Sequence, residues 1–256
     1  MADVFDVSGQ GFATGIHYLH NISRTALDRQ TLDIGLDYRL FENTVNFFGE
    51  NLGVDVASFP VSLRYQYVAR RGNNAFSAGI GYVRNIPGLV GRNDDETYRE
   101  SRAGADADWD LFEVNGAYQY TFPSGWLLNI QGEGQYAGEP LISGEQFGLG
   151  GVRSLRGLEE REVAGDNALR ASLEVYTPAI ANSHRFLAFT DIGQYWRENT
   201  LPGEPDEDFI WTVGLGWRWN FQNRLSATVD LGYVLDGAFL SDSGNVRGHF
   251  SVNYSF

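Results

Sequence analysis

Residues 211–221 read WTVGLGWRWNF, in which large apolar side chains alternate with small or polar ones. Successive side chains of a β-strand point to opposite faces, so Trp211, Leu215 and Trp217 share one face. Thr212 and Arg218 share the other face. The segments 225–236 and 245–256 repeat this period of two. The C-terminal part of the chain therefore predicts strands with one apolar and one polar face.

The residue types on the apolar face favour a membrane barrel over a soluble β-sandwich, which has the same period. Trp and Tyr crowd the ends of the predicted strands, as in the aromatic girdles of transmembrane barrels. The chain of 256 residues has 14% aromatic residues and 31 glycines. It has no apolar run of about 18 residues that could form a transmembrane helix. We predict an all-β fold, with residues 1–256 forming one antiparallel transmembrane β-barrel domain.

About eleven segments carry the strand pattern, and a twelfth strand could lie within 42–58. The segments are 9–22, 31–41, 59–71, 74–85, 108–122, 124–138, 168–178, 184–197, 208–221, 225–236 and 245–256. Tight connections alternate with long polar ones near 42–58, 87–107, 139–167, 198–207 and 237–244, as short periplasmic and long extracellular connections do. Closed bacterial barrels usually have an even number of strands. We therefore favour a chain that covers part of a larger barrel.

Charge and composition argue against several functional classes. The formal net charge of −14 argues against a nucleic-acid partner, because phosphate binding requires clustered Lys and Arg, although an ordinary acidic surface explains the charge equally well. The chain has no cysteine, and its four histidines lack a metal-ligand spacing. No Gly-x-Ser-x-Gly motif occurs. We expect no metal, no cofactor and no enzymatic activity.

A glycine-rich segment at 147–178 reads FGLGGVRSLRGLEEREVAGDNALRASLEVYTP. It contains a Gly-Gly turn, an Arg-Gly tip, a Gly-Asp pair and a strand that carries a glutamate. In this order the segment resembles the barrel of two-partner secretion transporters, the haemolysin secretion/activation family. The family's loop carries a Val-Arg-Gly-[Tyr/Phe] motif and folds back into the barrel. The matching residues are Leu155, Arg156, Gly157 and Leu158, so both flanking hydrophobic positions differ from the motif.

A second match lies at 189–193, where FTDIG is similar to the family's Phe-x-Asp-x-Gly element. The resemblance implies that Arg156 meets Asp191 inside the barrel and that the two form a latch for the loop. Alternation places Asp191 on the inner face, since Phe186 and Ile192 define the opposite one. A guanidinium in a narrow lumen needs a carboxylate to offset its desolvation. The alternative is an exposed loop arginine, which is the default for this residue type.

The luminal loop is expected to span residues 144–167. Glu174 has a family counterpart, and we expect it to line the barrel wall in an ion pair. The residues that support the loop motif are Gly150, Gly151, Leu155, Gly157, Leu158, Gly165, Asp166, Glu174, Phe189 and Gly193. Further charged residues are expected to form a salt-bridge network or a hydrated wall inside the barrel, and these are Asp33, Asp37, Arg39, Arg64, Glu113, Glu133, Arg218, Asp230 and Arg247.

The resemblance also implies a location and a function. The family forms barrels of sixteen strands in the outer membrane of Gram-negative bacteria, and this chain matches roughly the C-terminal two-thirds of such a barrel. The first residues, MADVFDVSGQ, lack the features of a secretory signal, so we expect the signal peptide, the POTRA domains and the first strands to be missing. The full-length relative would export a large β-helical exoprotein through the barrel.

The implied partners are outer-membrane lipid, the exoprotein and the barrel-assembly machinery. The alternating residues Phe250, Val252, Tyr254 and Phe256 look like the C-terminal signal that this machinery recognises. Two other functions stay open. One is an insertase of the same superfamily, and the other is a passive pore formed by a truncated or engineered barrel.

Overall fold

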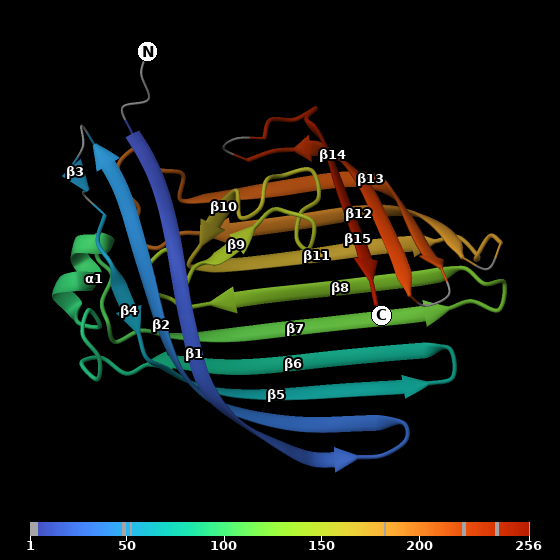
Figure 1. The fold of residues 1–256 in the computed structure, drawn as a ribbon, viewed down its shortest axis with the longest axis horizontal. Helices are drawn as coiled ribbons and strands as arrows, with labels where there is room; N and C mark the ends of the chain where they lie inside the picture. Colours follow the sequence, from blue (N-terminus) through green and yellow to red (C-terminus); the bar gives the residue numbers. More distant parts are fainter. Residues whose placement is uncertain are drawn as a thin grey trace.

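The computed structural model describes residues 5–47, 50–51, 53–181, 183–221, 224–238 and 241–255. Within these ranges, eleven long strands form one antiparallel sheet in chain order (Figure 1). They are β1 (Phe5–Arg24), β2 (Asp28–Phe47), β5 (Pro60–Arg71), β6 (Asn74–Asn85), β7 (Asp110–Thr121), β8 (Leu127–Tyr136), β11 (Asn167–Tyr176), β12 (His184–Trp196), β13 (Glu207–Phe221), β14 (Leu225–Asp236) and β15 (Val246–Tyr254). The predicted strands are confirmed, with shifts of a few residues at their ends.

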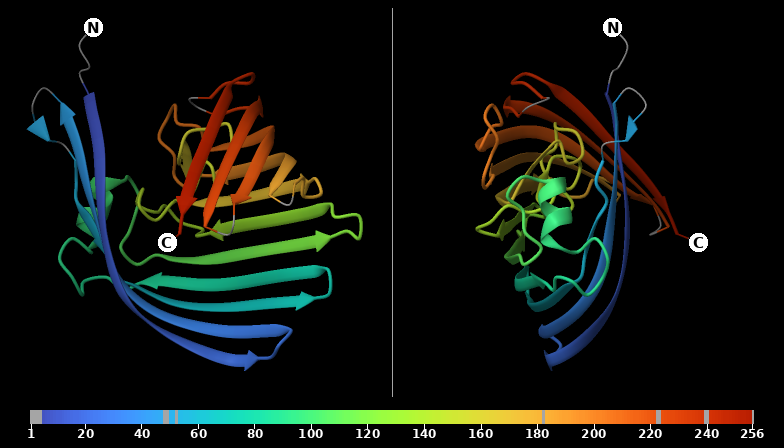
Figure 2. Two further views of the ribbon diagram at one scale, coloured as in Figure 1. Left: turned by 45° about the vertical axis from the view of Figure 1, so that its right-hand side comes forward. Right: turned by 90° about the vertical axis from the view of Figure 1, so that its left-hand side faces the viewer.

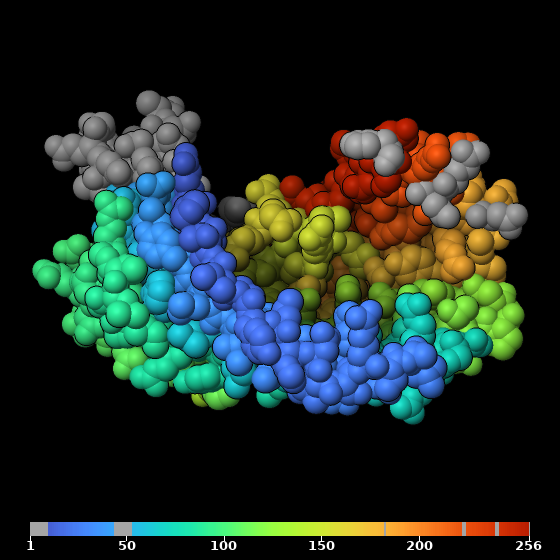
Figure 3. All heavy atoms as spheres, turned by 60° about the horizontal axis from the view of Figure 1, so that its bottom comes forward, coloured from blue at the N-terminus to red at the C-terminus, as the bar shows by residue number. Residues whose placement is uncertain are grey.

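The sheet is strongly curved and forms a trough (Figure 2). β1 and β15 stand at its two edges in the described part of the chain. Tight turns join the strands at one end, and the longer connections gather at the other (Figure 1). In the space-filling view the luminal loop, in yellow, lies between the blue N-terminal strands and the red C-terminal strands (Figure 3). The trough therefore has a concave face that the loop partly fills and an open convex face.

The convex face is apolar and the concave face is polar, as the alternation predicts. Leu215 on β13 is 67% exposed and Phe250 on β15 is 84% exposed. On the concave side, ion pairs join wall residues across the strands, among them Arg64 with Glu113 and Arg170 with Glu133. A soluble fold would have its apolar side chains on the inner face, so the polarity here is the reverse. This arrangement suits a sheet with lipid outside and water inside.

Five short elements lie in the segments that were expected to be loops. They are β3 (Glu50–Asn51), β4 (Val56–Ser58), α1 (Asp95–Ser101), β9 (Phe147–Leu149) and β10 (Val163–Gly165). β3 and β4 pair with β2, which itself continues to Phe47, so the described residues of 42–58 hold two short strands and no twelfth full-length one. No helix in the described ranges is long and apolar enough to cross a membrane.

A small apolar core lies under α1 at the end with the long connections. Asp94 caps the helix, since its carboxylate accepts a hydrogen bond of 3.0 Å from the Thr97 amide. Tyr98 then points inward, where it is fully buried together with Trp109. Its hydroxyl donates to the Ala57 carbonyl at 3.0 Å and so ties the helix to β4. The α1 connection is therefore a packed cap on this end of the sheet.

Candidate functional site

The luminal loop returns into the trough as a short hairpin. β9 and β10 pair antiparallel, with Phe147 opposite Gly165 and Leu149 opposite Val163. Gly150 and Gly151 follow β9 with φ angles of 116° and 93°, which are strained for residues with a side chain. A Cβ on Gly150 would also lie 2.2 Å from the Glu159 carbonyl oxygen. The Gly-Gly turn thus lets the chain double back tightly before the Arg-Gly tip.

Arg156 at the loop tip meets the wall of the trough through its whole guanidinium group. Its Nε and Nη2 donate to the two oxygens of Asp191 at 2.8 and 2.7 Å, and its Nη1 donates to Glu174 at 2.6 Å. The Arg156 main-chain amide also donates to Asp191, at 3.1 Å. The side chains of Arg156, Asp191 and Glu174 are 4%, 0% and 7% exposed. The structure therefore brings together the two residues that the sequence analysis paired.

Strand register explains why the partners of Arg156 converge. β11 and β12 place Ser172 opposite Asp191 and Glu174 opposite Phe189, so these four side chains share the concave face. Ser172 donates to Asp191 at 2.6 Å and accepts from Arg156 at 3.1 Å. The guanidinium carbon lies 3.5 Å from the centre of the Phe189 ring. The site is preorganised, because each carboxylate is held by wall residues as well as by the loop.

Glu174 differs from expectation. It was expected to pair along the wall, but it bonds the loop arginine instead. Its second oxygen accepts from Asn129 at 2.9 Å and from the Tyr176 hydroxyl at 2.8 Å. Arg156 is consequently shared between two carboxylates on neighbouring strands. The contact of the loop tip with the wall is therefore a three-residue cluster and not a single pair.

Apolar packing completes the seat of the loop. Leu155 and Leu158, which differ from the family motif, are both fully buried. They pack with Leu149, Val163, Tyr195, Ile210 and Val234 in one cluster. A Cβ on Gly193 would lie 2.8 Å from Leu155 Cδ1, so this wall glycine makes room for the loop. Leucine at the two flanking positions therefore preserves an apolar seat.

The two ends of the loop are anchored by buried carboxylates. Near the start, Glu145 accepts from Arg39 on β2 at 2.6 Å and from Ser58 at 2.7 Å. Burial raises the pKa of Glu145, although Arg39 and Ser58 act against this rise. At the far end, Asp166 is fully buried and forms an ion pair with Arg102. Burial raises the pKa of Asp166 too, but the bonds from Arg102 and two main-chain amides outweigh it, so the pKa lies below its ordinary value.

Most of the other predicted inner residues form ion pairs on the concave face, four of them between wall residues and two, through Glu145 and Glu159, with the luminal loop. These pairs are Arg39–Glu145, Arg39–Asp37, Arg64–Glu113, Arg170–Glu133, Arg218–Asp230 and Arg247–Glu159. Asp33 bonds His17, which also contacts Asp37. Phe250, Val252 and Tyr254 lie on the exposed face of β15, and Phe256 lies outside the described residues. Sequence reasoning did not find Arg102 or Glu145, because their partners are distant in the chain.

Comparison with known proteins identifies the family. A family model described as haemolysin secretion/activation protein ShlB/FhaC/HecB matches residues 2–219. The chain belongs to this family. It is therefore an outer-membrane β-barrel chain of a Gram-negative bacterium, in the group of two-partner secretion transporters.

Two solved structures show the same fold. CdiB from Acinetobacter baumannii is 21% identical with a TM-score of 0.74, and CdiB from Escherichia coli is 15% identical with a TM-score of 0.78. Each alignment covers 98% of this chain but only 43% and 46% of the two CdiB chains. The chain thus spans less than half the length of these relatives. No curated protein matches the sequence.

Proposed function

We propose that this chain is the channel part of a transporter that exports a large β-helical exoprotein across the outer membrane. The luminal loop is its latch, which is closed when Arg156 is bonded to Asp191 and Glu174. The observation that supports this proposal is the buried guanidinium, which is bonded at every nitrogen to the wall residues of β11 and β12. No chemical step on a substrate is required, because the work of the channel is conformational.

The energetics of a buried ion cluster suit a reversible latch. Removing charges from water costs free energy that their mutual attraction only partly repays, so a buried ion pair contributes little net stability. Its geometry, however, is strict, since the guanidinium fork matches only one arrangement of the carboxylates. The loop is consequently held in one position without being held strongly. Water in an opened lumen would solvate the separated charges and lower the cost of release.

The convex face and the last strand are consistent with the two other proposed partners, outer-membrane lipid and the barrel-assembly machinery. Outer-membrane lipid would contact the apolar convex face, on which Leu215 and Phe250 are widely exposed. The barrel-assembly machinery would recognise β15, whose apolar side chains point outward in the described residues. The exoprotein would pass along the concave face once the loop has moved.

The test compares the host strain that makes the full-length protein with a strain from which its gene has been deleted. Comparison of the culture supernatants identifies any extracellular polypeptide that depends on the protein. We expect one large polypeptide to disappear on deletion and to return with the wild-type protein. Supernatants that do not differ would contradict export. A lower amount of other barrel proteins in the outer membrane of the deletion strain would indicate an insertase. Channel conductance by the protein, with no extracellular polypeptide that depends on it, would indicate a passive pore.

A further inference from the structure

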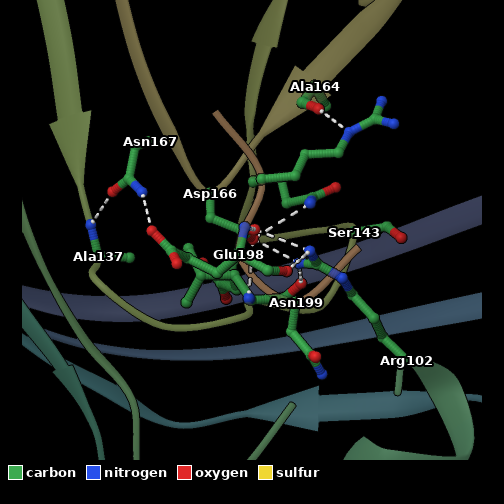
Figure 4. Close-up of polar contacts among 12 residues, drawn as sticks. Arg102, Ala137, Ser143, Ala164, Asp166, Asn167, Glu198 and Asn199 are labelled. Atoms are coloured by element: carbon green, nitrogen blue, oxygen red, sulfur yellow. Dashed lines mark hydrogen bonds and ion pairs between the residues drawn. The ribbon is translucent and has the colours of Figure 1, made fainter. Parts of the chain in front are cut away.

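Asp166 is bonded to several segments at once. Its Oδ2 accepts from Arg102 Nη2 at 2.7 Å and from the Glu198 amide at 2.8 Å (Figure 4). Its Oδ1 accepts from the Leu141 amide at 2.9 Å, from Gln146 at 3.2 Å and from Arg102 Nη1. The carboxylate is fully buried. A buried carboxylate with five donors is a joint between the segments that supply them.

The donors come from three of the long connections, which gather at one end of the sheet. Arg102 follows α1 in the connection between β6 and β7, Leu141 follows β8, and Glu198 follows β12. Arg102 also donates to the carbonyls of Leu141 and Glu198, the latter at 3.0 Å. Asn167 adds a bond of 2.8 Å from the Ala137 amide and one of 2.9 Å to Glu198 (Figure 4). We call the connections 86–109 and 197–206 the surface cap.

Asp166 is also connected tightly to the hairpin that carries the loop tip. Asp166 directly follows Gly165, the last residue of β10. A Cβ on Gly165 would lie 2.8 Å from the Tyr195 Cβ, so the backbone is pressed against β12. Arg197 donates to the Ala164 carbonyl at 2.9 Å and ties the same strand to the cap. A displacement of the cap must therefore move the root of the hairpin.

We propose that Asp166 is a positioning residue that couples the surface cap to the luminal loop, so that the tip leaves its seat only when Arg102 and the 197–206 connection are also displaced. Its consequence for export rests on the proposed function, but the coupling itself does not. The cap would then keep the latch closed from the end of the sheet that carries the long connections.

Amide hydrogen exchange on the full-length protein tests the coupling. Asp166→Asn keeps the shape of the side chain but loses its charge. We expect it to speed exchange at the distant Arg156 amide, which bonds Asp191, and not only at the Leu141 and Glu198 amides that bond Asp166 itself. A coupling of ordinary strength corresponds to about 5–150-fold faster exchange. Faster exchange confined to Leu141, Glu198 and their neighbours would overturn the proposal.

Coupling between two sites is reciprocal, which supplies a second variant. Asp191→Asn removes the wall charge that holds the tip and should also speed exchange of the Leu141 and Glu198 amides. Asp108→Asn is the matched control, because Asp108 pairs with Arg84 at the same end of the barrel but both side chains are at least half exposed. It should leave the Arg156 amide unchanged. If Asp191→Asn leaves the exchange rates of the Leu141 and Glu198 amides unchanged, the coupling is contradicted, even if Asp166→Asn fails to fold.

Export is measured separately on the same variants. If Asp166→Asn speeds exchange at both places while the supernatant stays as in the wild type, the coupling stands and the role of the loop as a latch is wrong. If export changes while exchange at the Arg156 amide does not, the coupling is wrong and the proposed function stands. The two failures are thus distinguishable.

Discussion

Arg156 occupies the space that a side chain at position 232 would need. A Cβ on Gly232 of β14 would lie 2.4 Å from the Arg156 carbonyl oxygen and 2.7 Å from the Gly157 amide nitrogen. The loop tip is therefore seated by a missing side chain on one wall and by two carboxylates on the other. Contacts of this closeness are possible only against glycine.

Gly232→Ala should displace the loop tip without harming the barrel. The added methyl group meets main-chain atoms, which cannot move aside, so the Arg156 contacts must lengthen. We expect a larger single-channel conductance and faster exchange at the Arg156 amide. Gly116→Ala is the control, since its nearest neighbour would be 3.8 Å away. Equal conductance in the two variants would show that the tip does not rest on Gly232.

Asp191→Ala should lower the stability of the folded barrel. Removing one partner of a buried pair typically costs about 3–5 kcal/mol, although Glu174 would retain part of the charge balance here. The temperature at which the heat-modifiable band shifts on a gel should fall. Asp108→Ala, which breaks an exposed pair, should leave that temperature nearly unchanged. Equal shifts in the two variants would mean that the buried cluster does not stabilise the barrel.

Arg156→Lys should separate charge from geometry. Lysine keeps the positive charge but cannot bond both oxygens of Asp191 and reach Glu174 at the same time. We expect a conductance between that of the wild type and that of Arg156→Ala. Full recovery with lysine would mean that charge alone holds the loop.

The two anchoring carboxylates should take up protons in a fixed order as the pH falls. Glu145 has a raised pKa, so it is protonated first, and this favours the folded state because the buried charge is removed. Asp166 has a lowered pKa, so its contribution to stability persists until the pH falls through that lower value. Infrared titration of the wild type against Glu145→Gln and Asp166→Asn would show the order. Protonation of Asp166 before Glu145 would contradict it.

The two faces of the sheet can be tested with spin labels, because the chain has no cysteine. A label at Leu215 should be accessible to oxygen, which concentrates in lipid. A label at Thr228, whose side chain bonds Ser251 on the concave face, should be accessible to a water-soluble nickel complex. The reverse result would mean that the faces are assigned wrongly.

The strands, and the face of the sheet on which each side chain lies, could be predicted from the sequence because both follow from a local pattern. The period of two fixes which face a residue occupies, and β12 shows this for Asp191. The contact of Arg156 with Asp191 could be expected only through the family motif. Arg102 and Glu145 could not be found, since they meet residues 64 and 106 positions away. Such pairings depend on how the surface connections fold, and alternation carries no information about that.

The helix α1 escaped prediction for a related reason. It has seven residues, too few for a clear helical period, and is held by a capping aspartate and one buried tyrosine. Alternation alone places Gly232 on the polar face and gives no sign of its role. Its role becomes visible only when the loop is placed against β14.

The most direct test of the account locks the loop in place. Leu155→Cys with Gly193→Cys in the full-length protein introduces two thiols at positions whose side chains would touch, because a Cβ on Gly193 would lie 2.8 Å from Leu155 Cδ1. The account predicts that export of the dependent polypeptide stops under oxidising conditions and resumes on reduction, while either single variant exports throughout. Undiminished export by the oxidised, crosslinked protein would contradict the claim that the luminal loop is the latch.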